Sequence, residues 1–481
     1  KIKDLYKNGQ PDWRMPIKTL PSTTEQSIIA GLRELPGVGV DEQGVRSYPN
    51  GPSASHTVGY INKVNADDLK TLAAKGYTED DIVGRTGVEA WAEETLAGGL
   101  GGKLTVIGSD GQTQSTISEK PLTPSSNLLL SLNMDLQKKA EAILGSNVGS
   151  IVVMDVTNGA VLALANFPTF DPNLFIQGIT QDQFNALNND PRKPFQHRAV
   201  NAQLPTGSTF KVISASAALE RGGMNMQTTF TCTGHWTGLG DAFGKDCWLK
   251  TGHGKISLYE GIVQSCDVVF YEVGKKLDEI DANILPDMAK AYGLGVPTDM
   301  QGLYAATGQV PSPKWKQDTL NQPWVRGDAV NLAIGQGYLL ASPMQLALVY
   351  AAIANGGQVH VPRLAEQAID PETNGISRAF PVQTKQVPVN SNNLNLIRQA
   401  LTDVTQKPQG TARAMFASSK VVVAGKTGTA ESGIEQPHAW FACFAPAAKP
   451  KYVVIVVVEH GGEGSTVAAP LARKVTDILP Y

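Results

Sequence analysis

The residues best suited to chemistry by type and spacing are a serine and a lysine in the segment PTGSTFK, residues 205–211. Pro and Gly precede Ser208 and an Ala-rich apolar run follows it, a pattern that predicts a turn leading into a helix. Lys211 comes one helical turn later, so its amine can reach the Ser208 hydroxyl. An adjacent base makes a serine nucleophilic, and free N–H groups at a helix start can stabilise an oxyanion. Ser-x-x-Lys alone also arises by chance, so further residues must support it.

Two later segments carry residues that this chemistry would use. In QSCD, Ser265 can relay a proton and Asp267 can fix a polar network, just before a second apolar helical pattern. The segment VVVAGKTGTAES ends a Val run as an edge strand would. It offers a positive charge for a substrate carboxylate, two hydroxyls, and a glycine that a substrate backbone can approach closely, at Lys426, Thr427, Gly428 and Thr429. Together the three segments indicate acyl transfer through a serine ester.

The elements that must position these residues follow from the apolar patterns. LNMDLQKKAEAILG predicts a helix started by Asn133 or Asp135 and closed by Gly145. SIVVMDVTNGAVLALAN predicts a hairpin around residues 157–159, and HAWFACFAP and YVVIVVVE predict two more strands before a last helix, PLARKVTDIL. Strands at both ends with helices between them favour an α+β fold, an antiparallel sheet flanked by a helical lobe.

The N-terminal third differs from the rest of the chain. It is rich in Gly, Pro and charge, and the Pro/Ser break KPLTPSSN follows it, so we predict an elongated non-catalytic module over residues 1–120 and a catalytic domain over 121–481. The net charge of −3 and the absence of a long basic run argue against nucleic acid as a partner. No apolar run of about eighteen residues occurs, so we expect no membrane span in this sequence.

The three segments, in this order, resemble the Ser-x-x-Lys, Ser-x-Asn/Asp and Lys-Thr/Ser-Gly motifs of the penicillin-recognising serine acyltransferases. HRAVNAQLPTGSTFK, AIGQGYLLASPMQLALVYAAIANGG and GKTGTAE followed by HAWFACFAP further resemble class B penicillin-binding proteins. HTVGYI and IVGRTGVEAWAEETLAGGLGG resemble the pedestal or dimerisation region of that family. Asp267 stands where many relatives carry Asn, a variant typical of the rod-elongation branch. The family's membrane anchor is missing, so we expect an ectodomain or a processed form.

This resemblance implies a transpeptidase (serine β-lactamase-like) domain and the activity of a D,D-transpeptidase that cross-links peptidoglycan. Ser208 would be acylated by the penultimate D-alanine of a donor stem peptide, with Lys211 as base and Ser265 as proton relay. The backbone N–H groups of Ser208 and Thr429 would form the oxyanion hole. An amine of a second stem peptide then attacks the acyl-enzyme, and β-lactams would stall at the acyl stage.

The resemblance also implies a setting for this reaction. We expect cell-wall synthesis partners such as a glycosyltransferase, and a place on the extracytoplasmic face of the bacterial cell membrane. Three alternatives remain: a serine β-lactamase and a β-lactam sensor, which share the motifs, and a scaffold that holds elongation or division partners through residues 1–120.

Three cysteines and a histidine fall in one short stretch, at Cys232, Cys247, His253 and Cys266. Such a set satisfies tetrahedral zinc, and Asp246 or Asp241 could replace one ligand. Some rod-elongation relatives carry a zinc site around their GHG and Ser-x-Asp segments, which this stretch resembles. A Cys232–Cys247 disulfide, with His253 a structural histidine and Cys266 a buried thiol, is an equally weighted alternative. The acyl-transfer chemistry needs no cofactor. Either a zinc site or a disulfide would therefore have the structural role of stabilising the second motif.

Two residues after the third motif have two interpretations. His438 and Trp440 follow the KTGT segment closely and could line the acceptor side of the cleft. An aromatic strand is more often part of a core, which is the competing interpretation for both.

Overall fold

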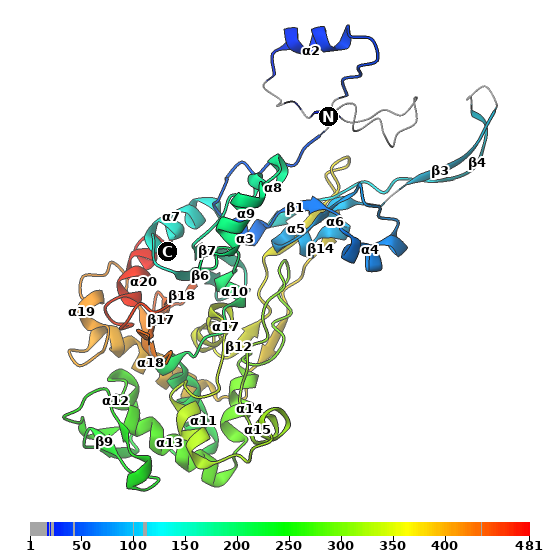
Figure 1. Ribbon diagram of the computed structural model, residues 1–481. Coiled ribbons are helices and arrows are strands. Elements are labelled where there is room, and N and C mark those ends of the chain that lie inside the picture. The colour runs from blue at the N-terminus through cyan, green and yellow to red at the C-terminus, as the bar shows by residue number, and fades with distance from the viewer. Residues whose placement is uncertain are drawn as a thin grey trace. The chain divides into compact units, whose positions relative to one another are not determined.

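The computed structural model describes residues 17–18, 20, 24–41, 44–99, 101–108, 113–433 and 435–481. The chain divides into two compact units, Lys1–Ser47 and Tyr48–Tyr481. In the first unit, the described residues include the helix α2 (Gln26–Arg33). None of the helices in the described ranges has the length and apolar character needed to cross a membrane. The elements that position the three motifs all belong to the second unit (Figure 1).

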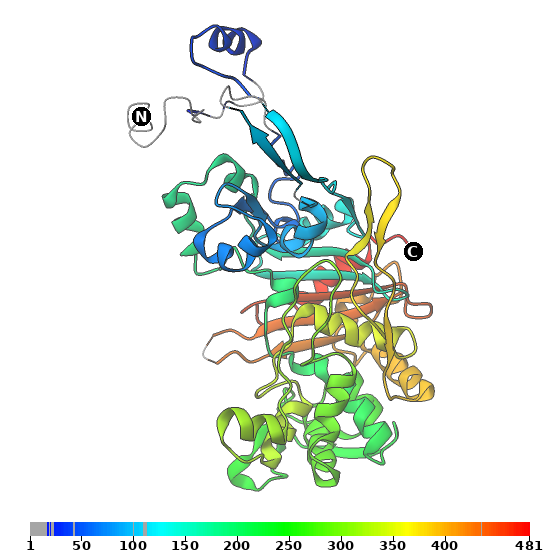
Figure 2. The same ribbon diagram turned by 90° about the vertical axis from the view of Figure 1, so that its right-hand side faces the viewer.

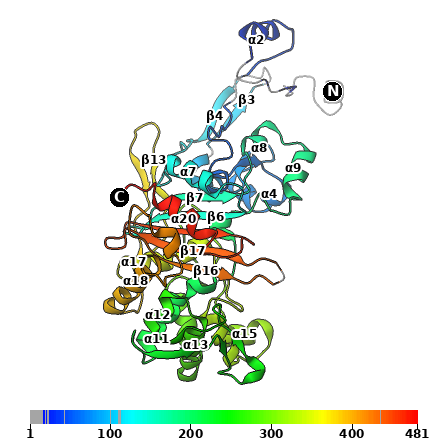
Figure 3. The same cartoon turned by 90° about the vertical axis from the view of Figure 1, so that its left-hand side faces the viewer.

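Five of the described strands form one antiparallel sheet at the centre of the second unit (Figure 3). Their order is β16 (Ala424–Ala430), β17 (His438–Ala445), β18 (Tyr452–Val458), β6 (Gly149–Asp155) and β7 (Val161–Phe167). β18 pairs with β6, so the two ends of the catalytic part meet in the middle of the sheet. Gly159 adopts φ +72° between β6 and β7, which confirms the predicted hairpin. β16, the strand of the third motif, is the outer strand, as predicted.

The sheet is apolar on both faces because helices cover both. Along β17, Trp440 and Phe444 pack into one core, whereas Phe441 and Cys443 pack into the other, the period-2 alternation of a strand. α17 (Pro343–Ala354) packs into the first core. α7 (Met134–Leu144) and α20 (Ala468–Thr476) pack into the second (Figure 3). Two cores thus fix the sheet that carries the third motif.

The predicted first helix of the catalytic part is confirmed as α7, with the expected ends. The Asn133 side chain accepts a hydrogen bond from the Leu136 backbone N–H at 3.0 Å, which satisfies one of the free donors at the helix start. Gly145 ends the helix with φ +59°. α20 confirms the predicted last helix.

Helices between the strands form the lobe that holds the first two motifs, coloured green in Figures 1 and 2. Its elements are the 3₁₀ turn η2 (Gly207–Phe210), α11 (Lys211–Arg221), α12 (Leu258–Val263), α13 (Asp267–Ile280), α14 (Ile284–Ala291), α15 (Pro313–Leu320) and α16 (Arg326–Ala333). Ser208 lies in η2 and the α-helix begins at Lys211, slightly later than the sequence predicts. Gly207 has φ +54°, which tightens the turn before the helix.

The predicted mixture of short helices and strands in the N-terminal third is confirmed. Its elements in the second unit are α3 (Ser55–Val58), β1 (Ile61–Lys63), α4 (Ala66–Leu72), η1 (Ala73–Lys75), β2 (Ile82–Gly84), α5 (Gly87–Trp91), α6 (Glu93–Ala97), β3 (Gly102–Ile107), β4 (Thr113–Lys120) and β5 (Asn127–Leu130). β5 joins a sheet with β13 and β14, which come from the catalytic part. The border at residue 120 stays a prediction.

Fourteen further elements complete the described part of the second unit. They are α8 (Asn173–Gln177), α9 (Gln181–Asn188), α10 (Arg198–Asn201), β8 (Thr229–Cys232), β9 (His235–Trp236), η3 (Asp241–Phe243), β10 (Lys245–Asp246), β11 (Gly254–Ser257), β12 (Gln358–His360), β13 (Ala365–Ile369), β14 (Ile376–Ala379), β15 (Thr384–Gln386), α18 (Ser391–Gln406) and α19 (Arg413–Phe416). β8 to β11 carry most of the cysteine cluster, and α18 packs beside β16.

Candidate active site

Ser208 lies in a turn that is pressed against the third-motif strand. A Cβ added to Gly207 would lie 2.5 Å from the Thr429 carbonyl oxygen, and one added to Gly335 would lie 2.1 Å from the Gly207 carbonyl oxygen. Real Cβ atoms do not approach so closely, so glycine is required at both positions. Ser208 itself is half-buried, and among the residues that the structure describes its hydroxyl has no hydrogen-bond partner. The turn therefore presents an unengaged hydroxyl beside β16.

Lys211 joins the first motif to the second. Its fully buried ammonium donates to Asp267 Oδ1 at 2.7 Å and to the Ser265 carbonyl oxygen at 2.8 Å, and it lies 3.4 Å from Ser265 Oγ. The ammonium also lies 5.3 Å from the centre of the Phe270 ring. The predicted convergence of Lys211 with the second motif is thus present, with the lysine in contact with both of its polar side chains.

The backbone of the second motif explains how Ser265 reaches Lys211. Ser265 has φ +56°, a left-handed conformation that is costly for a residue with a Cβ. This single residue ends α12 and turns the chain into α13, which begins at Asp267. The second oxygen of Asp267, Oδ2, accepts a hydrogen bond from the Trp248 backbone N–H at 2.9 Å. Asp267 therefore connects Lys211 to the loop that carries Cys247.

Lys426 of the third motif is a buried amine beside Lys211. It is fully buried and its Nζ donates to the Thr427 carbonyl oxygen at 3.1 Å. Burial, followed by the charge of Lys211, lowers the pKa of Lys426 well below the usual range for lysine, whereas Asp267 opposes this shift. An anion that enters this site would favour the charged form of Lys426.

The two threonines of the third motif are held by residues that the sequence analysis missed. Thr411 Oγ1 lies 2.8 Å from Thr427 Oγ1. Thr429 Oγ1 donates to Glu463 Oε2 at 3.0 Å and accepts from the Gly464 backbone N–H at 3.2 Å. Thr411 precedes a four-residue helix, and Glu463 is a charged residue within a Gly-rich loop after a Val-rich strand. The charge of Glu463 within a Gly-rich loop is a sequence feature that could have indicated a functional residue. Thr411 has no such feature in the sequence.

Gly428 has a packing role that the sequence analysis did not predict, while close approach of a substrate backbone to this glycine stays a prediction. A Cβ at this position would lie 2.8 Å from Thr209 Cγ2 and 2.9 Å from the Thr206 carbonyl oxygen. The close neighbour in the structure is thus the first-motif turn, which needs this space to contact β16.

His438 and Trp440 are buried, which favours the core interpretation. Trp440 is fully buried and its indole N–H donates to the Pro205 carbonyl oxygen at 3.0 Å. It therefore braces the turn before Ser208, and the interpretation of Trp440 as a residue lining the cleft is wrong because the side chain has no exposed surface. His438 is 5% exposed and accepts from the His460 backbone N–H at 3.1 Å. Burial lowers the pKa of His438 to about 4.

The cysteine cluster converges as the sequence predicts. The side-chain ligand atoms of Cys232, Cys247, His253 and Cys266 all lie within 4.8 Å of one another. His253 Nδ1 lies 3.5 Å from Cys232 Sγ and 3.6 Å from Cys247 Sγ. All four cysteines of the chain lie in the described part and all are free, so the structure does not contain the alternative Cys232–Cys247 disulfide. A hydrogen bond with Cys266, together with one to His253, lowers the pKa of Cys247, which favours a thiolate.

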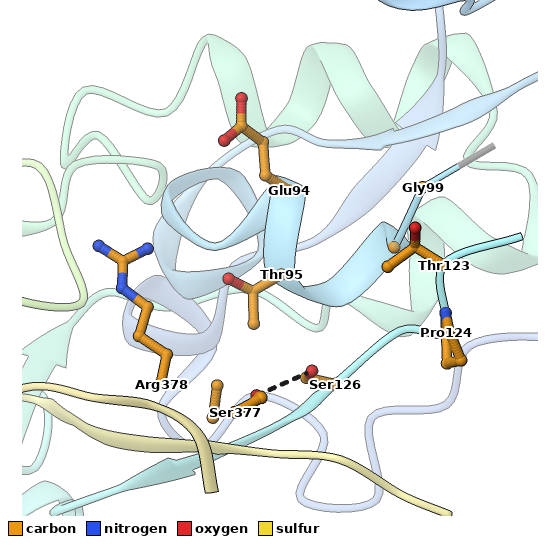
Figure 4. Close-up of a pocket in the computed structure, with 10 residues that line it drawn as sticks. Glu94, Thr95, Gly99, Thr123, Pro124, Ser126, Ser377 and Arg378 are labelled. Carbon is orange, nitrogen blue, oxygen red and sulfur yellow. Dashed lines mark hydrogen bonds between the residues drawn. The ribbon is translucent and has the colours of Figure 1, made fainter.

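A pocket of about 310 Å³ lies away from the motifs, between α6 and the β13–β14 hairpin (Figure 4). Hydroxyl groups of Thr95, Thr123, Ser126 and Ser377 line it, with Glu94 and Arg378 at its rim. It contains none of the motif residues.

Comparison with known families identifies the chain. Residues 149–477 match the penicillin binding protein transpeptidase domain, and residues 2–130 match the penicillin-binding protein dimerisation domain. The chain belongs to the class B penicillin-binding proteins. This penicillin-binding protein is 31% identical to the peptidoglycan D,D-transpeptidase MrdA of Haemophilus influenzae over 96% of its own length and 74% of the relative. It is 29% identical to MrdA of Escherichia coli over 96% of its length and 76% of the relative.

Solved structures of the same family share the fold of this penicillin-binding protein. PBP2 of Helicobacter pylori in its complex with MreC superposes with a TM-score of 0.85 at 32% identity, covering 96% of this chain and 84% of that chain. PBP2 of Pseudomonas aeruginosa, solved in complex with WCK 5153, superposes with a TM-score of 0.78 at 32% identity, covering 90% of each chain. The expected α+β transpeptidase fold with an N-terminal pedestal module is thereby confirmed.

Proposed function

We propose that Ser208 is the nucleophile with which this peptidoglycan D,D-transpeptidase cross-links stem peptides, and that β-lactams acylate the same residue. One observation carries this assignment. The unengaged Ser208 hydroxyl lies in a turn that touches β16 at Thr429, while the helix that follows the turn begins with Lys211 in contact with Ser265 and Asp267. A nucleophile, a candidate base and an edge strand for substrate binding therefore meet in one place.

Acylation uses the first two motifs. Lys211, which first gives up one proton to become a neutral amine, takes the proton from the Ser208 hydroxyl as Oγ attacks the carbonyl carbon of the penultimate D-alanine. Ser265 Oγ, 3.4 Å from Lys211 Nζ, passes a proton to the leaving D-alanine amine. The backbone N–H groups of Ser208 and Thr429 stabilise the oxyanion, and the contact of the Ser208 turn with β16 supports their proximity. The hydrogen bond from the Ser208 hydroxyl to Lys211 forms when the substrate binds, because catalytic hydrogen bonds often tighten only in the substrate complex.

The third motif binds the terminal carboxylate of the donor. Lys211 and Lys426 are both buried, and Asp267 is the carboxylate that contacts Lys211, so an excess of positive charge lies in the site. Burial, followed by the charge of Lys211, lowers the pKa of Lys426, so its positive charge is unfavourable until an anion binds. A substrate carboxylate compensates it, and the Thr427 hydroxyl, held by Thr411, lies next to Lys426 to hydrogen-bond the same group.

Covalent labelling tests the assignment. We expect a fluorescent penicillin to label the unmodified protein and to leave Ser208→Ala unlabelled, with intact-mass spectrometry showing an adduct on the unmodified chain alone. Ser391→Ala, a change at an exposed serine of α18, serves as the matched control and should label normally. Labelling of Ser208→Ala at the normal level would refute the assignment.

The alternatives within the superfamily are less favoured. A serine β-lactamase must hydrolyse its acyl-enzyme rapidly, and relatives that match nearly the whole chain are named D,D-transpeptidases. The match of residues 2–130 to a dimerisation domain also supports a penicillin-binding protein over a sensor. A scaffold role through the N-terminal third is compatible with catalysis and adds to it.

A structural zinc ion is the best use of the cysteine cluster, although the reaction itself needs no cofactor. Three thiols and one imidazole form a donor set that zinc prefers. The four ligand atoms lie within 4.8 Å of one another, a spacing that one four-coordinate ion would bridge. Cys232, Cys247, His253 and Cys266 would hold the ion. Bound zinc would hold the loop of Trp248 against Asp267.

The partners of the chain belong to cell-wall synthesis. We place it on the extracytoplasmic face of the bacterial cell membrane, with peptidoglycan stem peptides as substrates, a membrane anchor outside this sequence, and a glycosyltransferase as partner. Exposed apolar side chains on the paired strands β3 and β4, at Leu104, Ile107 and Ile117, support a protein partner there. A related chain comes from a peptidoglycan synthase complex of polymerization and crosslinking, with a TM-score of 0.79 and 29% identity.

A further inference from the structure

Glu463 is an unpaired carboxylate at the outer end of the third motif. Its Oε2 accepts a hydrogen bond from Thr429 Oγ1 at 3.0 Å. The side chain is exposed, and within the described part of the chain no Lys, Arg or His forms an ion pair with it, while Oε1 has no hydrogen-bond partner there. Glu459 pairs with Arg198 and Glu435 with His460, whereas Glu431, two residues after Thr429, also has no ion pair in the described part of the chain. Glu463 therefore directs an uncompensated negative charge toward the solvent beside Thr429.

The backbone holds Glu463 in this place. A Cβ on the next residue, Gly464, would lie 2.2 Å from the Gly428 carbonyl oxygen and 2.4 Å from the Trp440 carbonyl oxygen, so the loop lies directly on β16 and β17. The Glu463 carbonyl oxygen accepts from the backbone N–H groups of Thr466 and Val467, at 3.2 and 3.0 Å. The carboxylate is thus attached to a tightly packed loop, and its hydrogen bond to Thr429 sets its direction.

The charges along β16 match the two substrates of a transpeptidase. Lys426 is buried, and Glu463 contacts Thr429, which lies three residues or about 10 Å further along β16 and on the other face of the strand. The donor stem peptide ends in a carboxylate, whereas the acceptor brings an amine that enters as an ammonium ion. A site that processes both needs a cation for the first and an anion for the second.

We propose that Glu463 binds the ammonium group of the acceptor stem peptide and so selects a cationic primary amine for the second half-reaction. This inference rests on the proposed acyl-enzyme at Ser208. The ammonium loses one proton to water, and the amine nitrogen attacks the ester carbonyl carbon. The new C–N bond replaces the C–O bond to Ser208 Oγ, which takes the second proton of the amine. In acylation Glu463 acts only through its hydrogen bond to Thr429, because the donor carboxylate binds at Lys426.

Separate measurement of the two half-reactions tests this role. We would measure the acylation rate with a fluorescent penicillin, and then the partition of the acyl-enzyme from a D-Ala-D-Ala thioester analogue between water, glycinamide and methanol. Glycinamide is largely an ammonium ion at pH 7, whereas methanol is neutral. For Glu463→Gln we expect a rise of about fivefold in the KM for glycinamide, the size expected for one exposed ion pair. Acylation and transfer to methanol, which report on the support that Glu463 gives to Thr429, should change far less than the KM for glycinamide.

Controls distinguish binding of the amine from support of Thr429. Glu463→Asp should retain most of the preference for glycinamide, and Glu372→Gln, at an exposed glutamate after β13, should behave as the unmodified protein. In the unmodified protein, added KCl should raise the KM for glycinamide and leave transfer to methanol unchanged, which tests the charge without any variant.

Two results would overturn the inference. An unchanged KM for glycinamide in Glu463→Gln would show that the carboxylate does not bind the amine. An equal loss in acylation and in both transfers would show that Glu463 only supports Thr429. Absence of any acylation in the unmodified protein would instead contradict the nucleophile assignment, so the two proposals fail differently.

Discussion

The carboxylate of Asp267 uses both of its oxygens as acceptors, which explains why this chain carries Asp in its second motif. Oδ1 faces the Lys211 ammonium at 2.7 Å and Oδ2 faces the Trp248 backbone N–H at 2.9 Å. An asparagine has only one acceptor oxygen, so its NH₂ group would face one of these two donors. In this chain an Asn would therefore lose one of the two contacts.

At the residue scale we therefore expect Asp267→Asn to slow acylation. The change leaves the fully buried Lys211 without its charged partner, although partial exposure of Asp267 limits the loss. We expect a decrease of at least about tenfold in the second-order rate constant with a fluorescent penicillin, which corresponds to ~1.4 kcal/mol of barrier. Asp287→Asn, at an exposed carboxylate of α14, is the control. An unchanged rate would mean that the Trp248 N–H does not constrain the motif.

The residues of the three motifs were predictable because each motif is local in sequence and has a fixed chemical pattern. Lys211, Ser265 and Asp267 meet as expected. The contacts of Thr411 and Glu463 with the third motif were not predictable. Each is made by a single side chain from a loop that is remote in sequence, and no local sequence pattern indicates such a contact. The packing role of Gly428 was also hidden, since it depends on a turn more than two hundred residues earlier in the chain.

At the element scale, the strands, the first helix and the hairpin followed from periodicity and caps. The order of the strands did not, because β18 pairs with β6 across almost three hundred residues. The cysteine cluster was predictable only in part. Its members come from β8, from the loop after β10, from the loop before β11 and from the start of α13, so spacing alone could not separate a metal site from a disulfide.

We expect about one zinc ion per chain in protein purified without added metal. Cys247→Ala and Cys266→Ala should each lower this content strongly, because a tetrahedral site needs all four ligands. Cys443→Ala, in β17 outside the cluster, should retain the metal. Chelation should expose the three cluster thiols to a thiol reagent and slow acylation through the Trp248 loop. Metal content that is equal in Cys266→Ala and the unmodified protein would exclude the site.

At the scale of the whole second unit, buried polar contacts connect the N-terminal residues to the catalytic part. Ser53 Oγ donates to Glu141 Oε2 at 2.6 Å, and His56 Nε2 contacts the Pro194 carbonyl oxygen at 2.6 Å. The His56 ring lies 5.7 Å from the ring of His197, which precedes the buried Arg198. Burial lowers the pKa of His56 to about 4, and it also lowers the pKa of His197 well below the usual range.

We therefore expect the protein to lose stability as the pH falls from about 6.5 toward 4. The unfolded chain binds a proton at His56 below about pH 6.5, whereas the folded chain resists it until about pH 4, so acid favours unfolding. The difference amounts to at most about 3 kcal/mol for this residue. Thermal unfolding at pH 7.5 and pH 5 should show a smaller shift in His56→Gln, which keeps an N–H donor for Pro194 but cannot titrate. Equal shifts in both proteins would contradict this assignment.

The glycines that allow the Ser208 turn to pack against β16 have a consequence for drug resistance. A methyl group at Gly207, Gly335 or Gly428 would come within 3 Å of another backbone oxygen, at Thr429, Gly207 or Thr206. A bacterium under β-lactam selection therefore cannot adjust the centre of the target by small substitutions there without damaging its own wall synthesis. We expect escape mutations to accumulate instead in exposed loops near the three motifs, because surface positions tolerate substitution better than packed ones.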